Sequence, residues 1–370
     1  MQGFSASNRA GITIKPFLNA PKISVSIHDT LVSLLQETIF DINDMQSTEK
    51  PLLYLSRKDI ENINLPMARI IEALEEMFRQ KGSGQTEMPP KPGIHPLPDA
   101  FIHAMPAYIP AMKSAGIKWV SGYPQNQKLN LPYISGLLIM NDPATGIPTS
   151  VMDCTWITAK RTGAATAIAA KRLARKNSES VGILACGVQG RSNLEALACV
   201  FNITKVKAFD VAPGVARRFA DEMSSQLGLN IEPVEKPEQA VRGLDIVVTS
   251  GPILKKPNAI IDIDWLEEGS FASPVDFDTY WSGRALGQID LLATDDHEQM
   301  EFYRGEGFFQ ETPKPYADLG ELLAGKKQGR QNDSQRTMSI NLGIALEDMA
   351  TAILIQKEAL AKGIGTRLAL

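Results

Sequence analysis

The sequence predicts an α/β fold, with a doubly wound parallel sheet in the middle of the chain and a second, strand-rich part. Short apolar runs and helical patterns alternate from residue 180 to about residue 310, which is typical of such a sheet. Between residues 100 and 153, strand patterns follow one another without helices, as in an antiparallel meander. An apolar run, a glycine turn and a helical pattern occupy residues 181–201 in that order, which indicates a Rossmann-type sheet.

Length and composition narrow the class of protein. The chain has 370 residues, enough for two domains, and its 38 basic and 42 acidic residues leave a net charge of −4. This charge gives no electrostatic basis for binding nucleic acid. No apolar run reaches the roughly 18 residues that a membrane span needs, and no secretory signal opens the chain. We therefore expect no nucleic-acid partner and no membrane partner.

The cysteines and histidines show neither disulfide nor metal-ligand spacing. Cys154, Cys186 and Cys199 are odd in number and form no C-x-x-C pair, which favours a reducing compartment, the cytoplasm. The four histidines are equally scattered along the chain. We therefore expect no metal site.

The first elements follow from capping and turn signals. Residues 1–50 are interpreted as an N-terminal extension of unknown role. Residues 52–55 suit a strand, and Ser56 can cap the helix that is expected directly after it. A second helix is expected over residues 66–80, because its proline suits the first helical turn.

The later elements are predicted from the period of the apolar residues. The meander strands are expected at residues 100–108, 115–121, 134–141 and 147–153, with a hairpin turn at 141–146. The parallel strands are expected at residues 181–186, 205–210, 229–234, 244–249, 269–273 and 289–293. A last helix, over residues 340–362, is expected to pack back on the N-terminal part of the chain.

The turn after residues 181–186 indicates a dinucleotide site. Gly187 and Gly190 stand where a G-x-G-x-x-G fingerprint has its second and third glycines, whereas Ala185 replaces the first. Asp210 ends the next strand, 23 positions beyond Gly187, where a ribose-binding carboxylate belongs. Its charge would repel a 2′-phosphate, so NAD is favoured over NADP, although Arg217 and its neighbour Arg218 keep NADP open. The alternative is a plain turn between a strand and a helix.

Three basic residues stand in apolar or small-residue surroundings, where a charge is costly without a partner. They are Lys91, Lys118 and Arg161. Together they suggest a clamp for a substrate carboxylate, since arginine binds a carboxylate through two parallel bonds and lysine adds a point charge. Each one alone could equally be a salt-bridge partner or a surface residue.

Two strand ends carry further candidates. Asp276 and Asp278 follow the strand expected at 269–273, where a carboxylate could move protons during catalysis or could simply cap a helix. Thr249 and Ser250 end the preceding strand and could approach the ribose next to the nicotinamide, or form only a tight turn.

With these pieces in order, the chain resembles the ornithine cyclodeaminase/mu-crystallin family. The resemblance covers roughly residues 53–361. Its most specific blocks are Met105-Pro106-Ala107-Tyr108, the stretch Gly116 to Asn126 that contains Lys118, Thr158-Ala159-Lys160-Arg161-Thr162, Gly187-Val188-Gln189, and Leu342 to Asp348.

The resemblance implies a subunit of two domains. A strand-rich α+β dimerisation domain, which also binds the substrate, is built from both chain ends, residues 51–157 and 335–370. A Rossmann domain at residues 158–334 binds the dinucleotide, and the protein is implied to be a homodimer. Lys118 and Arg161 would grip the substrate carboxylate with Lys91, Lys118 would also belong to the catalytic centre, and Asp278 would transfer the proton. The implied cofactor-binding residues are Thr162, Gly187, Val188, Gln189, Gly190, Asp210, Thr249 and Ser250.

Three positions depart from the family pattern. Ala185 adds a methyl group to the glycine turn, and a Val-Asp-Phe-Asp loop at 275–278 replaces a glycine-rich one. His103 stands where cyclodeaminases carry a glutamate, and it could serve as an acid or base instead, or simply pack. We therefore expect an NAD(P)-dependent oxidoreductase acting on the C–N bond of an α-amino or imino acid. The alternatives are a cyclodeaminase that uses bound NAD with no net redox change, and a non-catalytic dinucleotide-dependent binding protein of the mu-crystallin kind.

Overall fold

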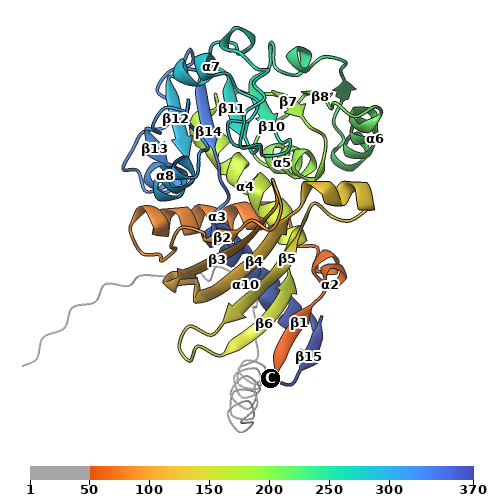
Figure 1. Ribbon diagram of the computed structural model, residues 1–370, viewed down its shortest axis with the longest axis vertical. Coiled ribbons are helices and arrows are strands. Elements are labelled where there is room, and N and C mark those ends of the chain that lie inside the picture. The colour runs from red at the N-terminus through yellow and green to blue at the C-terminus, as the bar shows by residue number, and fades with distance from the viewer. Residues whose placement is uncertain (1–50) are drawn as a thin grey trace, which may run out of the picture. The chain divides into compact units, whose positions relative to one another are not determined.

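The computed structural model describes residues 51–370 and contains two sheets (Figure 1). The predicted extension at residues 1–50 lies outside the described residues. The first sheet has seven strands in the order β15 (Thr366–Leu368), β1 (Leu52–Leu55), β6 (Pro148–Asp153), β5 (Ile134–Asn141), β4 (Ser114–Gly122), β3 (Phe101–Ile109) and β2 (Gly93–Ile94). Strands β3 to β6 are antiparallel neighbours in sequence order, which confirms the predicted meander.

The second sheet has eight strands, and all of its neighbouring pairs are parallel. Their order is β13 (Ala317–Asp318), β12 (Leu291–Thr294), β14 (Thr337–Ile340), β11 (Phe271–Pro274), β10 (Ile246–Thr249), β7 (Ser180–Leu184), β8 (Lys205–Phe209) and β9 (Ile231–Pro233). The order reverses between β7 and β10, which creates the crevice where ligands bind in such folds. The predicted Rossmann-type sheet is confirmed.

Helices pack on both sheets. They are α2 (Arg57–Ile63), α3 (Met67–Gly82), α4 (Thr155–Leu173), α5 (Val188–Ala198), α6 (Val215–Leu227), α7 (Gly283–Gly287), α8 (His297–Gly305), α9 (Leu319–Leu323) and α10 (Ala345–Lys362). Short 3₁₀ turns occupy Pro110–Met112, Pro124–Leu129, Pro237–Ala240 and Ile263–Trp265. Ser56 caps α2 as predicted, because its hydroxyl accepts a hydrogen bond from the backbone N–H of Asp59. None of the helices from residue 51 onward is long and apolar enough to cross a membrane.

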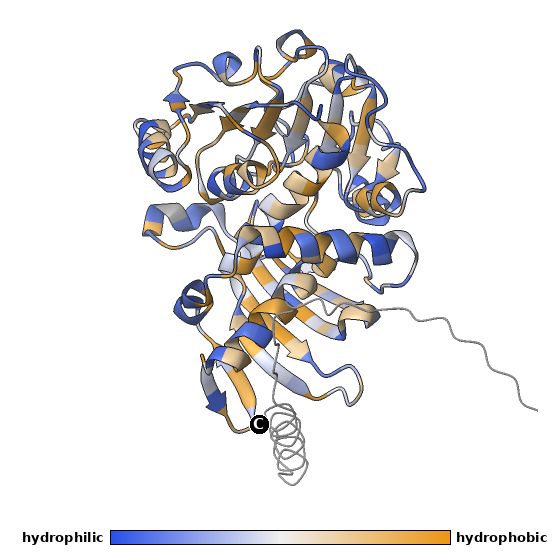
Figure 2. Ribbon diagram, turned by 180° about the vertical axis from the view of Figure 1, so that it is seen from behind, coloured by the Kyte–Doolittle hydropathy of each residue, from blue (hydrophilic) through white to orange (hydrophobic). Residues whose placement is uncertain are grey.

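Helix α4 lies between the two sheets, and its small residues make this position possible (Figure 1). A methyl group at Gly163 would lie 2.3 Å from the carbonyl oxygen of Ser192, so only glycine allows α5 to approach this closely. The Ser192 hydroxyl donates a hydrogen bond of 2.6 Å to the carbonyl of Ala159 across the same contact. Figure 2 shows hydrophobic residues along the strands and on α4, and hydrophilic residues on the outer faces of the helices.

The end of the chain differs from the prediction in one respect. Residues 337–340 form strand β14, which pairs with β11 and β12 in the parallel sheet. The last helix therefore begins at Ala345 rather than at residue 340. It covers the inner face of the seven-stranded sheet, where the hydroxyl of Ser114 on β4 donates to the carbonyl of Met349 over 2.9 Å. Because β14 belongs to the parallel sheet, we propose to move the predicted domain boundary from residue 335 to the loop at residues 341–344.

Candidate active site

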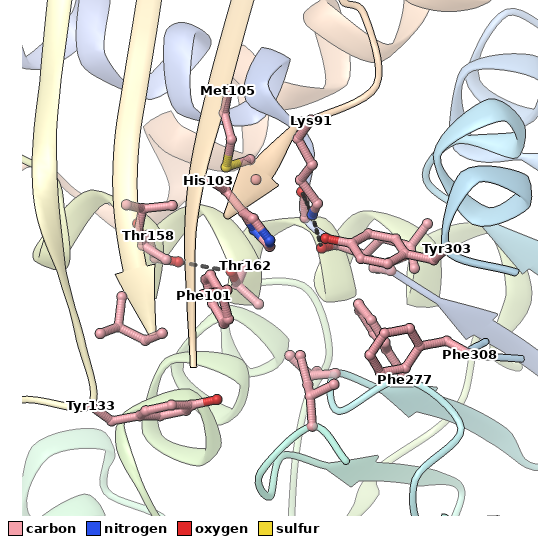
Figure 3. Close-up of a pocket in the computed structure, with 18 of the residues that line it drawn as sticks. Lys91, Phe101, His103, Met105, Tyr133, Thr158, Thr162, Phe277, Tyr303 and Phe308 are labelled. Atoms are coloured by element: carbon pink, nitrogen blue, oxygen red, sulfur yellow. Dashed lines mark hydrogen bonds between the residues drawn. The ribbon is translucent and has the colours of Figure 1, made fainter. Parts of the chain in front are cut away.

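A cavity of about 470 Å³ lies where the two sheets and α4 meet. Its walls come from β3 and β4 of the first sheet, from α4, from the start of α5, and from the loops after β10, β11 and β14. Helix α8 closes it with Phe302 and Tyr303. Figure 3 shows the side chains of Lys91, His103 and Tyr303 close together in this cavity.

The three predicted basic residues all line this cavity and are all buried. Lys91 donates two hydrogen bonds of 3.0 Å, to the carbonyl oxygens of Leu342 and Gly343 in the loop after β14. Lys118 lies 2.6 Å from a carboxylate oxygen of Asp348 and 3.4 Å from the hydroxyl of Thr158. The structure therefore brings together residues that are distant in the sequence.

Arg161 is bound by two acidic residues at the start of α10. Its Nη1 donates to Glu347 over 2.8 Å, and its Nε donates to Asp348 over 3.0 Å. Within residues 51–370, the N–H groups on Nη2 have no hydrogen-bond partner, and each of the two lysines also has a donor left. A carboxylate in the cavity can therefore bind these cations without displacing the pairs that hold them.

Gly343 is required for the position of Arg161. A methyl group at Gly343 would lie 2.4 Å from Nη1 of Arg161, and the residue has a φ of +75°, which favours glycine. Its N–H donates to the buried carboxylate of Asp295 over 2.7 Å, which fixes the loop. The loop after β14 thus positions both Arg161 and Lys91.

Burial shifts the pKa values of several of these groups. It lowers the pKa of Lys91 to about 7, with further contributions from Arg161 and Lys118, and it lowers the pKa of Lys118 as well. Burial raises the pKa of Glu347 to about 8, against the opposing effect of the neighbouring Arg161. Lys118 and Arg161 both pair with the carboxylate of Asp348, so three basic side chains meet only two acidic ones, and this ratio favours an anionic ligand.

The glycine turn leads into the N-terminus of α5. Gly187 is the N-cap, no side chain caps the helix, and nothing lies within 4 Å of the position of a Gly187 methyl group. Free backbone N–H groups at such a helix end bind phosphate oxygens. Ala185 has a φ of +72°, a left-handed conformation that favours glycine, which is the residue that the fingerprint has at this position. Val188 and Gly190 lie in the first turn of the helix.

Asp210 lies beside this turn, as predicted. Its carboxylate accepts hydrogen bonds of 2.8 Å from the backbone N–H groups of Cys186 and Ala212. It follows β8, the strand next to β7, at the carboxyl ends of the strands. Arg217 and Arg218 are exposed on α6.

Two amide side chains on the cavity wall have buried polar atoms without a partner among residues 51–370. They are Oε1 of Gln189 and Nδ2 of Asn341. Thr162 also lines the cavity, and its hydroxyl donates to the carbonyl of Thr158 (Figure 3). Buried polar atoms rarely stay unpaired, so we expect these two atoms to bond to water or to a ligand that offers both an acceptor and a donor.

The structure does not bring Asp278 or Thr249 to the cavity wall. Asp278 is buried and accepts a hydrogen bond of 2.9 Å from the hydroxyl of Thr312. The hydroxyl of Thr249 is committed, because it donates to Asp276 over 2.6 Å and accepts from Nε1 of Trp281. The hydroxyl of Ser250 donates a hydrogen bond of 2.8 Å to the carbonyl of Ala185 and so stabilises the glycine turn.

Asp276 is also removed from the cavity. It is fully buried, and its carboxylate accepts from the hydroxyl of Thr249 and from the N–H of Gly251, which fixes two strand ends to each other. Burial raises its pKa to about 7. The residues of this loop that do reach the cavity are its apolar members, Val275 and Phe277. Neither of the two predicted carboxylates lines the cavity.

His103 lines the cavity but is uncharged near neutral pH. Burial, with a smaller contribution from Lys91, lowers its pKa to about 3. Its ring stacks on Phe101 with centroids 4.2 Å apart and planes inclined by 17°. The histidine therefore supplies an aromatic surface and cannot replace an ionised glutamate.

Sequence reasoning missed the partners of the basic residues and the aromatic part of the cavity. Glu347 and Asp348 lie in the stretch Leu342 to Asp348, and the signal that could have revealed them is two adjacent acids at the start of a helix whose next residues are apolar. Phe277 and Tyr303 had no such signal. The side chains of His297, Asp318 and Glu321 also lie close together. Asp318 and Glu321 form a capping box at the start of α9, and Lys81 pairs with Asp318, so this cluster stabilises the start of the helix.

Comparison with known proteins agrees with this arrangement. The family model of the ornithine cyclodeaminase/mu-crystallin family matches residues 52–363. The chain belongs to this family.

Individual members of the ornithine cyclodeaminase/mu-crystallin family match over nearly their whole length. The nodulation efficiency protein NfeD of Rhizobium meliloti is 36% identical over 85% of this chain and 98% of its own. The Δ1-pyrroline-2-carboxylate reductase of Thermococcus litoralis, solved with NADH and L-proline, has a TM-score of 0.78 and 34% identity over 85% of this chain and 99% of its own. An archaeal alanine dehydrogenase dimer with bound NAD has a TM-score of 0.77 and 34% identity over 86% and 99%.

Proposed function

We propose that the protein is an NAD-dependent oxidoreductase that acts on the C–N bond of an α-amino or imino acid. One observation carries the proposal: three buried basic side chains with spare donors share a cavity with unpaired amide groups next to a glycine turn. This combination suits a carboxylate beside a dinucleotide. The T. litoralis reductase and the archaeal alanine dehydrogenase, which act on this chemical class, support the proposal.

The residues present fit a nicotinamide dinucleotide. The N-terminus of α5, with Gly187, Val188 and Gly190, would hold the pyrophosphate, and Asp210 would accept hydrogen bonds from the adenosine ribose. Gln189 and Asn341, with their unpaired atoms, suit a ribose hydroxyl or a carboxamide. The charge of Asp210 favours NAD over NADP. When bound, the nicotinamide accepts a hydride from the substrate α-carbon or returns it.

Lys118 and Arg161 would hold the substrate carboxylate through their spare donors. This fixes the α-carbon in one position, which removes most of the entropy cost of bringing the reactants together. In the oxidative direction the α-C–H bond breaks, the amine loses a proton, and a C=N bond forms. Water then adds to the imine carbon, the C–N bond breaks, and a 2-oxo acid and ammonium leave.

Lys91 is proposed as the group that transfers the proton, in place of Asp278. It lines the cavity, and its pKa of about 7 lets it accept and donate protons near neutrality. Asp278 bonds Thr312 outside the cavity wall and is therefore not retained as the catalytic acid or base.

The test is an assay of the full chain with NAD, a panel of amino acids, and the corresponding 2-oxo acids with ammonium and NADH. Consumption or formation of reduced nicotinamide, followed by its near-ultraviolet absorbance, supports the oxidoreductase. Release of ammonium from a diamino acid without any net change in that absorbance would identify a cyclodeaminase. Saturable binding of NADH without turnover of any substrate would identify a binding protein.

We also propose that the protein forms a homodimer through the outer face of the seven-stranded sheet. Tyr54, Trp119 and Leu137 on this face are 38%, 48% and 46% exposed, and Trp119 is paired with Leu137 in the register of β4 and β5. The archaeal alanine dehydrogenase is a dimer, which supports a second copy as the occupant. W119E should yield a monomer in light scattering, whereas V211E, at an 88% exposed position in the loop after β8, should not. Cys154, Cys186 and Cys199 are free, which supports a reducing compartment such as the cytoplasm.

A further inference from the structure

One end of the cavity is built from aromatic rings. The ring of Phe277 lies 5.2 Å from that of Tyr303 and 5.6 Å from that of Phe308, centroid to centroid. Tyr303 and Phe308 are themselves perpendicular at 5.6 Å. All three residues line the cavity, and Figure 3 shows Phe277 and Phe308 side by side on its wall.

Phe277 holds this place in a strained backbone conformation. Its φ is +63°, a region that bulky residues avoid, and a glycine would be free of this strain. The ring is nevertheless almost completely buried among other rings. A strained residue on a cavity wall indicates that its side chain is needed there.

The opposite wall is aromatic and uncharged as well. Phe101 and His103 stack on each other there, and the neutral histidine adds no charge (Figure 3). The remaining charged residues of the cavity, apart from the buried cations, are Asp99, Lys255 and Glu306, and all three are exposed at its rim. A cationic side chain inside the cavity would therefore lose its hydration without gaining a buried carboxylate of its own.

The aromatic end begins directly beside the cations. Nζ of Lys91 lies 5.1 Å from the centre of the Tyr303 ring, and Phe277 lies on that same ring. A ligand whose carboxylate binds the basic residues would therefore extend its side chain toward Tyr303 and Phe277.

We infer that the substrate of this site is an amino or imino acid with an aromatic or similarly large apolar side chain, and that Phe277 determines this specificity. The inference rests on the proposed function for its carboxylate site. The aromatic wall of the cavity would distinguish the substrate of this protein from the small or diamino substrates of other enzymes.

The experiment measures ligand binding without turnover. Calorimetry of the full chain with saturating NAD compares 3-phenylpropanoate, propanoate and 5-aminopentanoate, which share a carboxylate and differ in the tail. We expect 3-phenylpropanoate to bind at least about 10-fold more tightly than either of the others, as apolar pockets discriminate to this extent. F277L should reduce this preference to about 3-fold or less.

Phe309 provides a matched control. It also has a positive φ, +57°, is buried to the same extent, and packs 4.9 Å from Phe277, but it does not line the cavity. F309L should therefore keep the preference, whatever it does to the melting temperature. If F277L does not fold, F308L tests the same wall.

Equal affinities for the three carboxylates, preference for 5-aminopentanoate, or no binding would each overturn the inference. A preference for 3-phenylpropanoate that F309L reduces as much as F277L would overturn the role of Phe277. Tight binding of 3-phenylpropanoate together with no nicotinamide turnover of any amino or imino acid would leave this specificity standing and would remove the proposed function.

Discussion

The ammonium nitrogen of Lys118 lies 2.6 Å from a carboxylate oxygen of Asp348, and both side chains are buried. The other oxygen of Asp348 accepts a hydrogen bond of 3.0 Å from Arg161. One carboxylate thus holds two cations from β4 and α4 at the cavity. It lies in the first turn of α10, where the helix dipole favours a negative charge.

Removing this carboxylate should destabilise the protein. D348N should lower the free energy of unfolding by about 3–5 kcal/mol, because it leaves two buried cations with little compensation. Urea denaturation followed by circular dichroism measures the change. E358Q serves as the control, since Glu358 forms solvent-screened pairs with Arg69 and Lys362 near the other end of the same helix, and its loss should change the stability far less. A change in D348N as small as that of the control would contradict the account.

Gly343 should be intolerant of a methyl group. G343A should push Arg161 from its position and weaken carboxylate binding by about 10-fold or more, roughly one arginine hydrogen bond. G325A is the matched control, because Gly325 has a φ of +74° against +75° but nothing within 4 Å. Both variants share the cost of alanine at a positive φ, so calorimetry with a carboxylate ligand isolates the contact with Arg161. Equal affinities of the two variants for the carboxylate ligand would refute the proposed effect of the Gly343 contact on Arg161.

A substitution at Ala185 should increase the stability of the protein. A185G should raise the free energy of unfolding by about 1 kcal/mol, because glycine adopts a φ of +72° without strain. A73G, in the interior of α3, should lower it by a similar amount or more, as glycine does inside helices. Thermal and urea unfolding of both variants give the comparison. A loss of stability in A185G would mean that the alanine methyl group packs better than its backbone conformation suggests.

The pH dependence of the reaction should report Lys91. In the oxidative direction the neutral amine accepts a proton, so kcat/KM should rise as the pH passes through about 7, the pKa of Lys91. In the reductive direction the protonated form donates, so the profile should fall over the same range. K91R should abolish this step in both directions, because arginine stays protonated. A step near pH 7 that persists in K91R would assign the titration to another group.

Asp278 provides the complementary test. D278N should keep kcat within about 3-fold of the wild type, because the carboxylate accepts a hydrogen bond from Thr312 and does not line the cavity. Loss of a general acid or base would instead lower kcat by about 100-fold or more. Steady-state kinetics at saturating cofactor measures it. A D278N variant that binds NADH normally but does not turn over would restore the aspartate as the catalytic group.

Local signals in the sequence predicted most of the elements, and long-range contacts limited the rest. The capping residue Ser56 and the alternation in β3 to β6 are local features, and the structure confirms both. Strand β14 was missed because four buried residues carry little periodicity, and its neighbours β11 and β12 lie far away in the sequence.

The site was predicted unevenly for the same reason. Lys91, Lys118 and Arg161 were recognisable because their local surroundings are apolar, and the structure brings them together. Their partners Glu347 and Asp348 lie 186 and 187 positions from Arg161 in the sequence, so no local pattern connects them. The position of Phe277 on the cavity wall was not predicted, because it depends on a positive φ that bulky residues rarely adopt and that no sequence pattern indicates.

The central claim is that the α-carbon of an amino or imino acid exchanges a hydride with a nicotinamide in this cavity. The most direct test uses NADH deuterated on either face of nicotinamide C4, with ammonium and phenylpyruvate, and mass spectrometry of the product. The account predicts phenylalanine that carries deuterium at its α-carbon from one of the two faces, and no label when R161Q replaces the wild type. Absence of label from both faces with phenylpyruvate and with every other 2-oxo acid of the panel would contradict the central claim.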